Sequence, residues 1–156
     1  MRSQVCKAGV VAEPWEDIDA AYQAVGRDLL GRDDLREGLR GRSPDEAAFF
    51  TLVLVGTEID NGGFSQLFTN STGDVINEAA AGAEHFGLVE HSRVLRNATD
   101  QLFPAGVPLD LETRLQQWDQ LDDSADEVIE ALDERWYALN DALEERLHAY
   151  VAGRAT

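Results

Sequence analysis

Carboxylate side chains recur at three- and four-residue steps near the C-terminus, a spacing that places them on one face of a helix. These residues are Asp126, Glu130, Asp133, Glu134, Asp141, Glu144 and Glu145. At a rise of about 1.5 Å per residue the run would be about 28 Å long, with a carboxylate every ~5 Å. One DNA strand carries a phosphate every ~3.4 Å, so a DNA-binding protein could accept this face in place of phosphates. Together with Asp119, Asp122 and Asp123, the run forms the candidate partner-binding surface; an ordinary solvated helix face is the alternative.

The net charge points to the same class of partner. The chain has 30 acidic and 13 basic residues among 156, a formal charge of −17, and residues 110–156 are its most acidic part. Such a charge disfavours direct binding to nucleic acid and to anionic membranes, because both are negative themselves. Basic proteins are therefore the natural partners. A bound cation or a salty environment would also account for the excess.

Few residues have the types and spacing that catalysis or metal binding requires. His85 and His91 are six residues apart, which misses the four-residue spacing of a helical metal-binding pair, and His148 stands alone. Cys6 is the only cysteine and has no recognisable activating base near it. No phosphate-binding loop or nucleophile elbow is present. We therefore expect no enzymatic activity, no metal site and no cofactor.

Helical spacing of apolar residues runs through nearly the whole chain and predicts an all-α fold. We expect a flexible arm at residues 1–12 and a single compact domain of about seven helices at 13–156. The predicted helices cover roughly residues 15–31, 43–60, 74–86, 88–102, 110–121 and 124–151, with a short turn at 64–68 and a charged connector at 33–42. Trp15, Trp118 and Trp136 fall on apolar stripes, which predicts core or dimer contacts.

Two of these helices matter most for the function. The helix from Ser43 is apolar on all sides and should be the buried central helix, opened by a capping box between Ser43 and Glu46. The last helix should be long and acidic, opened by a second capping box between Ser124 and Glu127. Its length would present the C-terminal carboxylates as one rigid row.

A second candidate site lies at residues 58–70, where the central helix is expected to stop. The residues concerned are Glu58, Asn61, Gly62, Gly63, Phe64, Gln66, Phe68 and Asn70. In the structural interpretation the glycines turn the backbone, the two phenylalanines anchor the corner in the core, and Asn70 caps the next helix. Glu58, Asn61 and Gln66 would then hydrogen-bond the amides of the loop. The alternative is a small polar pocket lined by these three side chains, able to hold a ligand or a peptide terminus.

The pattern Glu-x-x-Asn-Gly-Gly-Phe-x-Gln-x-Phe-x-Asn resembles the signature of the family called domain of unknown function 4375, and the resemblance extends over about residues 45–151. That family includes a bacterial DNA-mimic protein, an acidic helical dimer that occupies DNA-binding proteins in place of DNA. The resemblance implies a helical fold, a basic transcription factor or nucleoid protein as partner, and the option of a homodimer. Arg36, Arg40 and Arg42 depart locally from an acidic mimic.

Three hypotheses follow for the function. A DNA mimic predicts carboxylates gathered on one elongated face and binding that weakens with salt. Adaptation to salt, which the ratio of one lysine to twelve arginines also fits, predicts acids spread evenly over the surface. A ligand-binding role predicts a pocket at residues 58–70.

No apolar run is long enough for a signal peptide or a membrane span, so a cytoplasmic location is expected.

Overall fold

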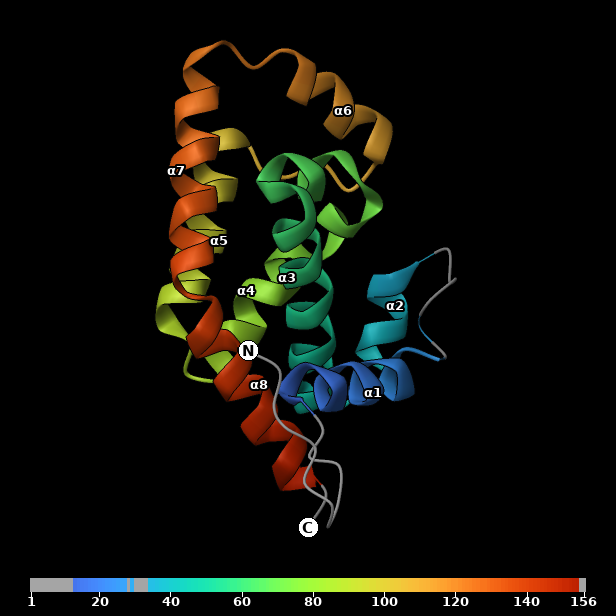
Figure 1. Cartoon of the computed structure of the whole chain (residues 1–156). Coiled ribbons are helices and arrows are strands. Elements are labelled where there is room, and N and C mark those ends of the chain that lie inside the picture. The colour runs from blue at the N-terminus through green and yellow to red at the C-terminus, as the bar shows by residue number, and fades with distance from the viewer. Residues whose placement is uncertain (1–12, 28, 30–33, 155–156) are drawn as a thin grey trace.

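Helices make up the regular structure of the chain (Figure 1). The computed structural model describes residues 13–27, 29 and 34–154; the predicted arm at 1–12 lies outside them. In this part of the chain there are eight α-helices, one short 3-10 helix and no strand, which confirms the all-α prediction. The elements are α1 Pro14–Gly26, α2 Leu35–Arg40, α3 Pro44–Thr69, η1 Ser71–Val75, α4 Ile76–His85, α5 Val89–Leu102, α6 Leu111–Asp119, α7 Ser124–Ala138 and α8 Asn140–Arg154.

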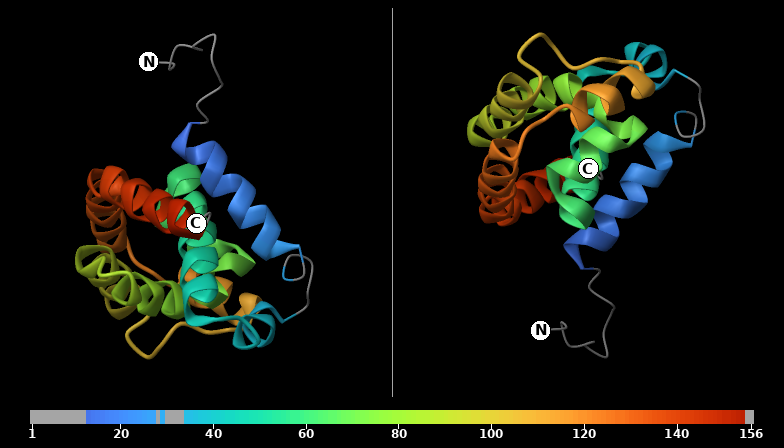
Figure 2. Two further views of the ribbon diagram at one scale, coloured as in Figure 1. Left: turned by 90° about the horizontal axis from the view of Figure 1, so that it is seen from below. Right: turned by 90° about the horizontal axis from the view of Figure 1, so that it is seen from above.

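Helix α3 is the buried centre of the molecule, as predicted. Its capping residue is Ser43, whose hydroxyl oxygen accepts a hydrogen bond from the backbone N–H of Glu46 (3.2 Å). Apolar side chains project from all sides of α3, and five of them are fully buried: Phe49, Phe50, Leu52, Val55 and Ile59. Helices α1, α4, α6 and α7 pack around it, and the views from above and below show α3 enclosed by them (Figure 2).

The glycines at residues 62 and 63 kink α3 but do not end it, which corrects the predicted stop. Gly62 has φ −155° and Gly63 has φ 72°, so the regular helix is interrupted at these two residues. Helical structure resumes at Phe64 and continues to Thr69. The reason is burial: Phe64 and Phe68 lie on the second segment with no exposed surface, so the chain must continue along the core.

The predicted long C-terminal helix is wrong in one respect, because the segment forms two helices. Leu139 separates α7 from α8, and α8 turns away to pack against α1 (Figure 1). The predicted capping box is also absent. Ser124 makes its backbone and side-chain hydrogen bonds to the carboxylate of Asp122, so Glu127 keeps no capping role.

Smaller differences concern the ends of elements. Helix α1 ends at Gly26, before the predicted Gly31, and the predicted connector at 33–42 contains α2, which Asp34 caps by accepting from the N–H of Glu37 (3.2 Å). Trp15 is 41% exposed and so is not a core residue, whereas Trp136 is fully buried. Among the described residues, no helix is long and apolar enough to cross a membrane.

Candidate functional site

An acidic surface covers the end of α6, the loop after it and one face of α7. We define it by seven carboxylates, all of them exposed: Asp119, Asp122, Asp123, Asp126, Glu127, Glu130 and Glu134. On α7, three of these recur at every fourth residue, which places them on one side of the helix. Glu127 was not predicted as a member, because the sequence pattern assigned it to a capping box that does not form.

Within the described residues, no carboxylate of the acidic surface forms an ion pair. The four arginines of residues 110–156 bind groups outside the acidic surface. Arg114 pairs with Asp74 and Arg135 with Glu90; Arg146 donates to the carbonyl of Phe86, and Arg154 lies over the ring of Tyr150. The negative charge of this surface is therefore not neutralised by the cations of residues 13–27 and 34–154.

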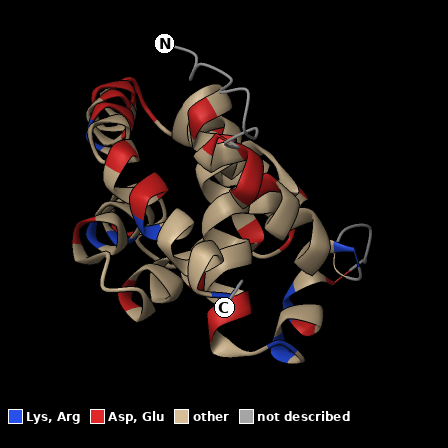
Figure 3. Ribbon diagram, turned by 60° about the horizontal axis from the view of Figure 1, so that its bottom comes forward, with Lys and Arg blue, Asp and Glu red and all other residues tan. Residues whose placement is uncertain are grey.

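Several carboxylates in the first two-thirds of the chain are paired with arginines. Glu78 pairs with Arg36 at 2.6 Å, Glu46 with Arg42 at 3.3 Å, and Glu84 with Arg96 at 3.0 Å. Figure 3 shows acidic residues on several helices and fewer basic ones among them. The acids are thus not confined to one elongated face. What distinguishes the acidic surface is that seven exposed carboxylates follow one another within residues 119–134 and none of them has a cationic partner among the described residues.

Asp133, predicted as part of the partner-binding row, points inward instead. Its Oδ1 accepts a hydrogen bond from the backbone N–H of Phe64 (2.8 Å), the first residue after the kink in α3. The carboxyl is partly buried, and this burial raises its pKa, although the N–H of Phe64 opposes the shift. Asp133 therefore acts as the N-terminal cap of the second segment of α3.

The remaining predicted acids, Asp141, Glu144 and Glu145, lie on α8 and do not extend the stripe of α7. Together with Pro14 and His148 they line a separate hollow of about 330 Å³ between the start of α1 and α8. The continuous 28 Å row is therefore not formed. The stripe from Asp126 to Glu134 spans only about 12 Å of helix axis.

Side chains of the 58–70 motif bridge the two segments of α3 across the kink. Glu58 Oε2 accepts hydrogen bonds from the side-chain amides of Gln66 (3.3 Å) and Asn70 (2.9 Å). These are bonds between side chains, not the predicted bonds to loop amides. The side chain of Asn61 is exposed and forms no hydrogen bond with a side chain or a backbone amide of the described residues. The side chain of Asn70 makes no capping hydrogen bond to the following helix; its amide nitrogen donates to Glu58.

Both glycines of the motif are explained by close contacts. A Cβ at Gly63 would lie 2.5 Å from the carboxylate of Asp133, and the positive φ of this residue already disfavours any other amino acid. A Cβ at Gly62 would meet the side chain of Gln66 at 2.2 Å. The kink is thus specified by the residues that pack on it from α7 and from the following turn of α3.

Helix α7 and the start of α8 bind the kink at three points. Besides the Asp133 cap, the hydroxyl of Tyr137 donates to the carbonyl of Ile59 (3.1 Å) and the amide of Asn140 donates to the carboxylate of Asp60 (3.0 Å). Burial raises the pKa of Asp60. Helix α7 therefore carries both the side chains that hold the kink and carboxylates of the acidic surface, although the motif and the surface were predicted as separate sites.

Arg114 is a structural residue that the sequence analysis missed. It is fully buried and donates to the carbonyls of Phe68 (2.9 Å), Asn70 (2.6 Å) and Pro108 (2.7 Å) as well as to Asp74 (2.7 Å). It satisfies carbonyl groups at the end of α3 and ties that end to α6. Its burial could have been predicted, because Arg114 falls between Leu111 and Trp118 on the apolar stripe of α6.

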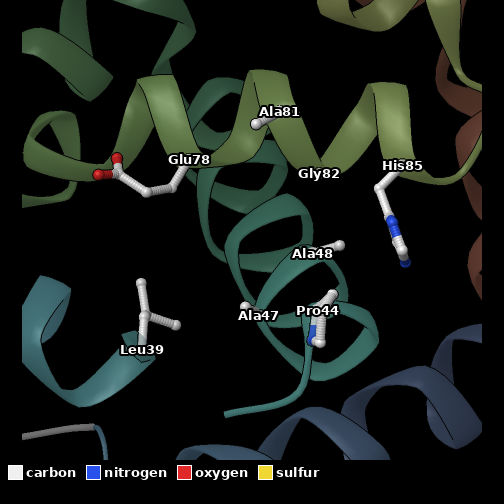
Figure 4. A pocket seen from close by; sticks show the side chains of 8 residues that line it. All are labelled: Leu39, Pro44, Ala47, Ala48, Glu78, Ala81, Gly82 and His85. Atoms are coloured by element: carbon white, nitrogen blue, oxygen red, sulfur yellow. The ribbon is translucent and has the colours of Figure 1, made fainter. Parts of the chain in front are cut away.

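Hollows lie elsewhere on the described part of the molecule. The hollows beside His85, Arg36, His148 and Gln101 are not lined by Glu58, Asn61 or Gln66. An apolar hollow of about 340 Å³ lies between α2, the start of α3 and α4, with Glu78 and His85 at its ends (Figure 4). Nε2 of His85 lies 2.5 Å from Asp45. In the described ranges no group of three or more potential ligands could hold a metal ion.

Comparison with known proteins gave one match. A family model described as DMP19-like protein matches residues 40–154, which include the motif, the kink and the acidic surface. Comparisons with curated proteins and with solved structures gave no significant match.

Proposed function

Because the chain belongs to the DMP19-like protein family, we propose that it is a protein-binding module that acts as a DNA mimic. In this role the acidic surface occupies the DNA-binding surface of a basic protein, such as a transcription factor or a nucleoid protein. The observation that carries the proposal is the unneutralised charge of the acidic surface. Arg114, Arg135 and Arg146, from the same region of sequence, bind other groups, so no described cation neutralises these carboxylates.

Spacing along α7 supports the same role. Carboxylates at every fourth residue are about 6 Å apart along the helix axis, which is close to the ~6.8 Å between alternate phosphates of one DNA strand. A basic surface that binds phosphates could therefore place cationic side chains against Asp126, Glu130 and Glu134 in turn. The role is not enzymatic and requires no metal or cofactor.

A homodimer would make the mimic more effective. The stripe on one copy spans about 12 Å, whereas one turn of DNA spans ~34 Å. Two copies related by a two-fold axis would double the number of carboxylates that face a partner. Sedimentation velocity over a range of concentrations tests this part of the proposal; a monomer at all concentrations would refute it.

The partner is best tested by capture from a bacterial lysate at low salt, followed by elution with rising salt. We expect DNA-binding proteins to be retained and to be displaced by double-stranded DNA, because charge contacts of this kind weaken with ionic strength. Recovery of no DNA-binding protein, or retention that DNA does not affect, would refute the proposal.

A pair of matched variants locates the binding surface. The double variant Glu130→Gln and Glu134→Gln removes two charges from the acidic surface. The control, Asp19→Asn and Glu145→Gln, removes two charges from exposed carboxylates on α1 and α8. We expect the first to elute at clearly lower salt than the wild type and the control to elute like the wild type. Equal losses would mean that net charge, and not this surface, determines binding.

A further inference from the structure

A groove between α5 and α7 runs along the edge of the acidic surface. These helices pack side by side (Figures 1 and 2), and the hollow between them has a volume of about 300 Å³. Helix α5 contributes Asn97 and Gln101, and α7 contributes Glu127, Val128 and Leu132. Glu127 belongs both to the groove and to the acidic surface, so a partner seated on that surface reaches the groove directly.

The two ends of the groove differ in charge. Glu127 is exposed at one end and forms no ion pair with any described residue. Arg135 lies at the other end, about 12 Å farther along α7, where it is held by Glu90 at 3.1 Å. A cationic group that enters the groove is therefore directed towards Glu127 and away from Arg135.

Between the ends, the groove offers apolar surface and spare hydrogen-bond acceptors. Leu132 is buried and Val128 is half-buried, so the floor is apolar. The side-chain amides of Asn97 and Gln101 line the wall on α5, and neither bonds to another residue in the described part of the chain. The groove thus combines an apolar floor, unused amide oxygens and one uncompensated carboxylate.

We propose that this groove binds an arginine side chain of the basic partner, with the aliphatic stem over Val128 and Leu132 and the guanidinium against Glu127. This inference rests on the proposed function, since it names the group that the partner inserts beside the acidic surface. Arginine fits better than lysine for a stated reason. Its planar guanidinium has five donors and is weakly hydrated, so it can bond a carboxylate and amide oxygens at once, whereas an ammonium is a compact, strongly hydrated charge.

The groove can be probed without the natural partner. Acetyl-Gly-Arg-Gly-amide and the corresponding lysine peptide are titrated into the ¹⁵N-labelled protein at low salt, and the side-chain amide signals of Asn97 and Gln101 are followed by NMR. We expect the arginine peptide to shift these signals. The lysine peptide should have an affinity at least about fivefold lower. Equal shifts with both peptides, or shifts confined to residues outside the groove, would overturn the assignment.

Three variants provide the controls. Glu127→Gln should weaken the arginine peptide about tenfold, the value of a charge-assisted hydrogen bond. Glu130→Gln removes the same charge from the same helix outside the groove and should change binding less than about twofold. Ala131→Leu fills the groove at an exposed position, so it should abolish binding while the thermal midpoint is kept. Equal losses in the two glutamine variants, or unchanged binding by Ala131→Leu, would refute the groove.

The results separate this inference from the function on which it rests. If DNA-competed capture of basic proteins succeeds but Glu127→Gln and Ala131→Leu behave like the wild type, the groove is refuted and the mimic stands. If the arginine peptide binds in the groove but capture yields no DNA-binding protein, the mimic is refuted and the arginine site stands.

Discussion

Replacing Asp133 with alanine tests whether α7 holds the kink of α3 in place. The substitution removes the acceptor 2.8 Å from the N–H of Phe64 and leaves that donor buried beside a core side chain. Loss of a helix N-cap costs ~0.5–2 kcal/mol, and a buried unpaired donor costs ~1–3 kcal/mol. Because the burial of the Asp133 charge offsets part of this, we expect a net loss of about 1.5 kcal/mol. For a chain of this length Tm should fall by roughly 3–6 °C.

Urea unfolding followed by tryptophan fluorescence measures this loss, since Trp136 lies one turn from Asp133 on α7. Asp133→Asn keeps a carbonyl oxygen that can accept from Phe64 and should stay close to the wild type. Glu134→Ala is the matched control, because it removes a neighbouring exposed charge that bonds to nothing described and should change stability by less than ~0.5 kcal/mol. If Asp133→Ala and Glu134→Ala unfold at the same urea concentration, the capping role is refuted.

Three further predictions concern the same framework. In urea unfolding, Gly63→Ala should lower the free energy of unfolding by more than ~2 kcal/mol and Gly62→Ala by less. Only Gly63 combines a positive φ with a clash against a fixed carboxylate, so equal losses would contradict this reason. Arg114→Met should cost about 3–5 kcal/mol by calorimetry, since it leaves Asp74 and several carbonyls without their partner; a loss below about 1 kcal/mol would be inconsistent with that bonding. Burial raises the folded-state pKa of Asp133 above its unfolded value, so the wild type should gain stability relative to Asp133→Asn as pH falls from 7 through that pKa; a difference independent of pH would contradict the burial effect.

Local patterns in the sequence predicted most of the helices, and the reason is that their signals are local. Ser43 and Asp110 have suitable capping groups and begin α3 and α6 as expected. Burial of the central helix followed from its continuous apolar composition. The division of the C-terminal segment at Leu139 carried no such signal, because no glycine or proline marks it and the apolar spacing continues across it. The break is imposed by packing, since α8 turns to cover α1.

Candidate site residues were harder to predict because their roles depend on long-range contacts. Asp133 falls in step with the exposed carboxylates in sequence, yet a contact with Phe64, 69 residues away, turns it inward. Gly63 was recognised as a special backbone position, but the carboxylate that excludes a side chain there comes from another helix. Whether an acid is paired is likewise invisible in a sequence. Only the fold shows that Arg135 reaches Glu90 and leaves Glu127 and Glu130 alone.

The separation of paired from unpaired charges has a consequence for how this protein can change. Apart from Asp122, which accepts hydrogen bonds from Ser124, the carboxylates of the acidic surface form no side-chain hydrogen bond or ion pair with described residues. They can therefore be exchanged one by one with little effect on folding. The residues at the kink and Arg114 cannot, because their buried contacts hold the framework together. New partners could therefore be acquired through substitutions on α7 alone while the helical framework is inherited unchanged.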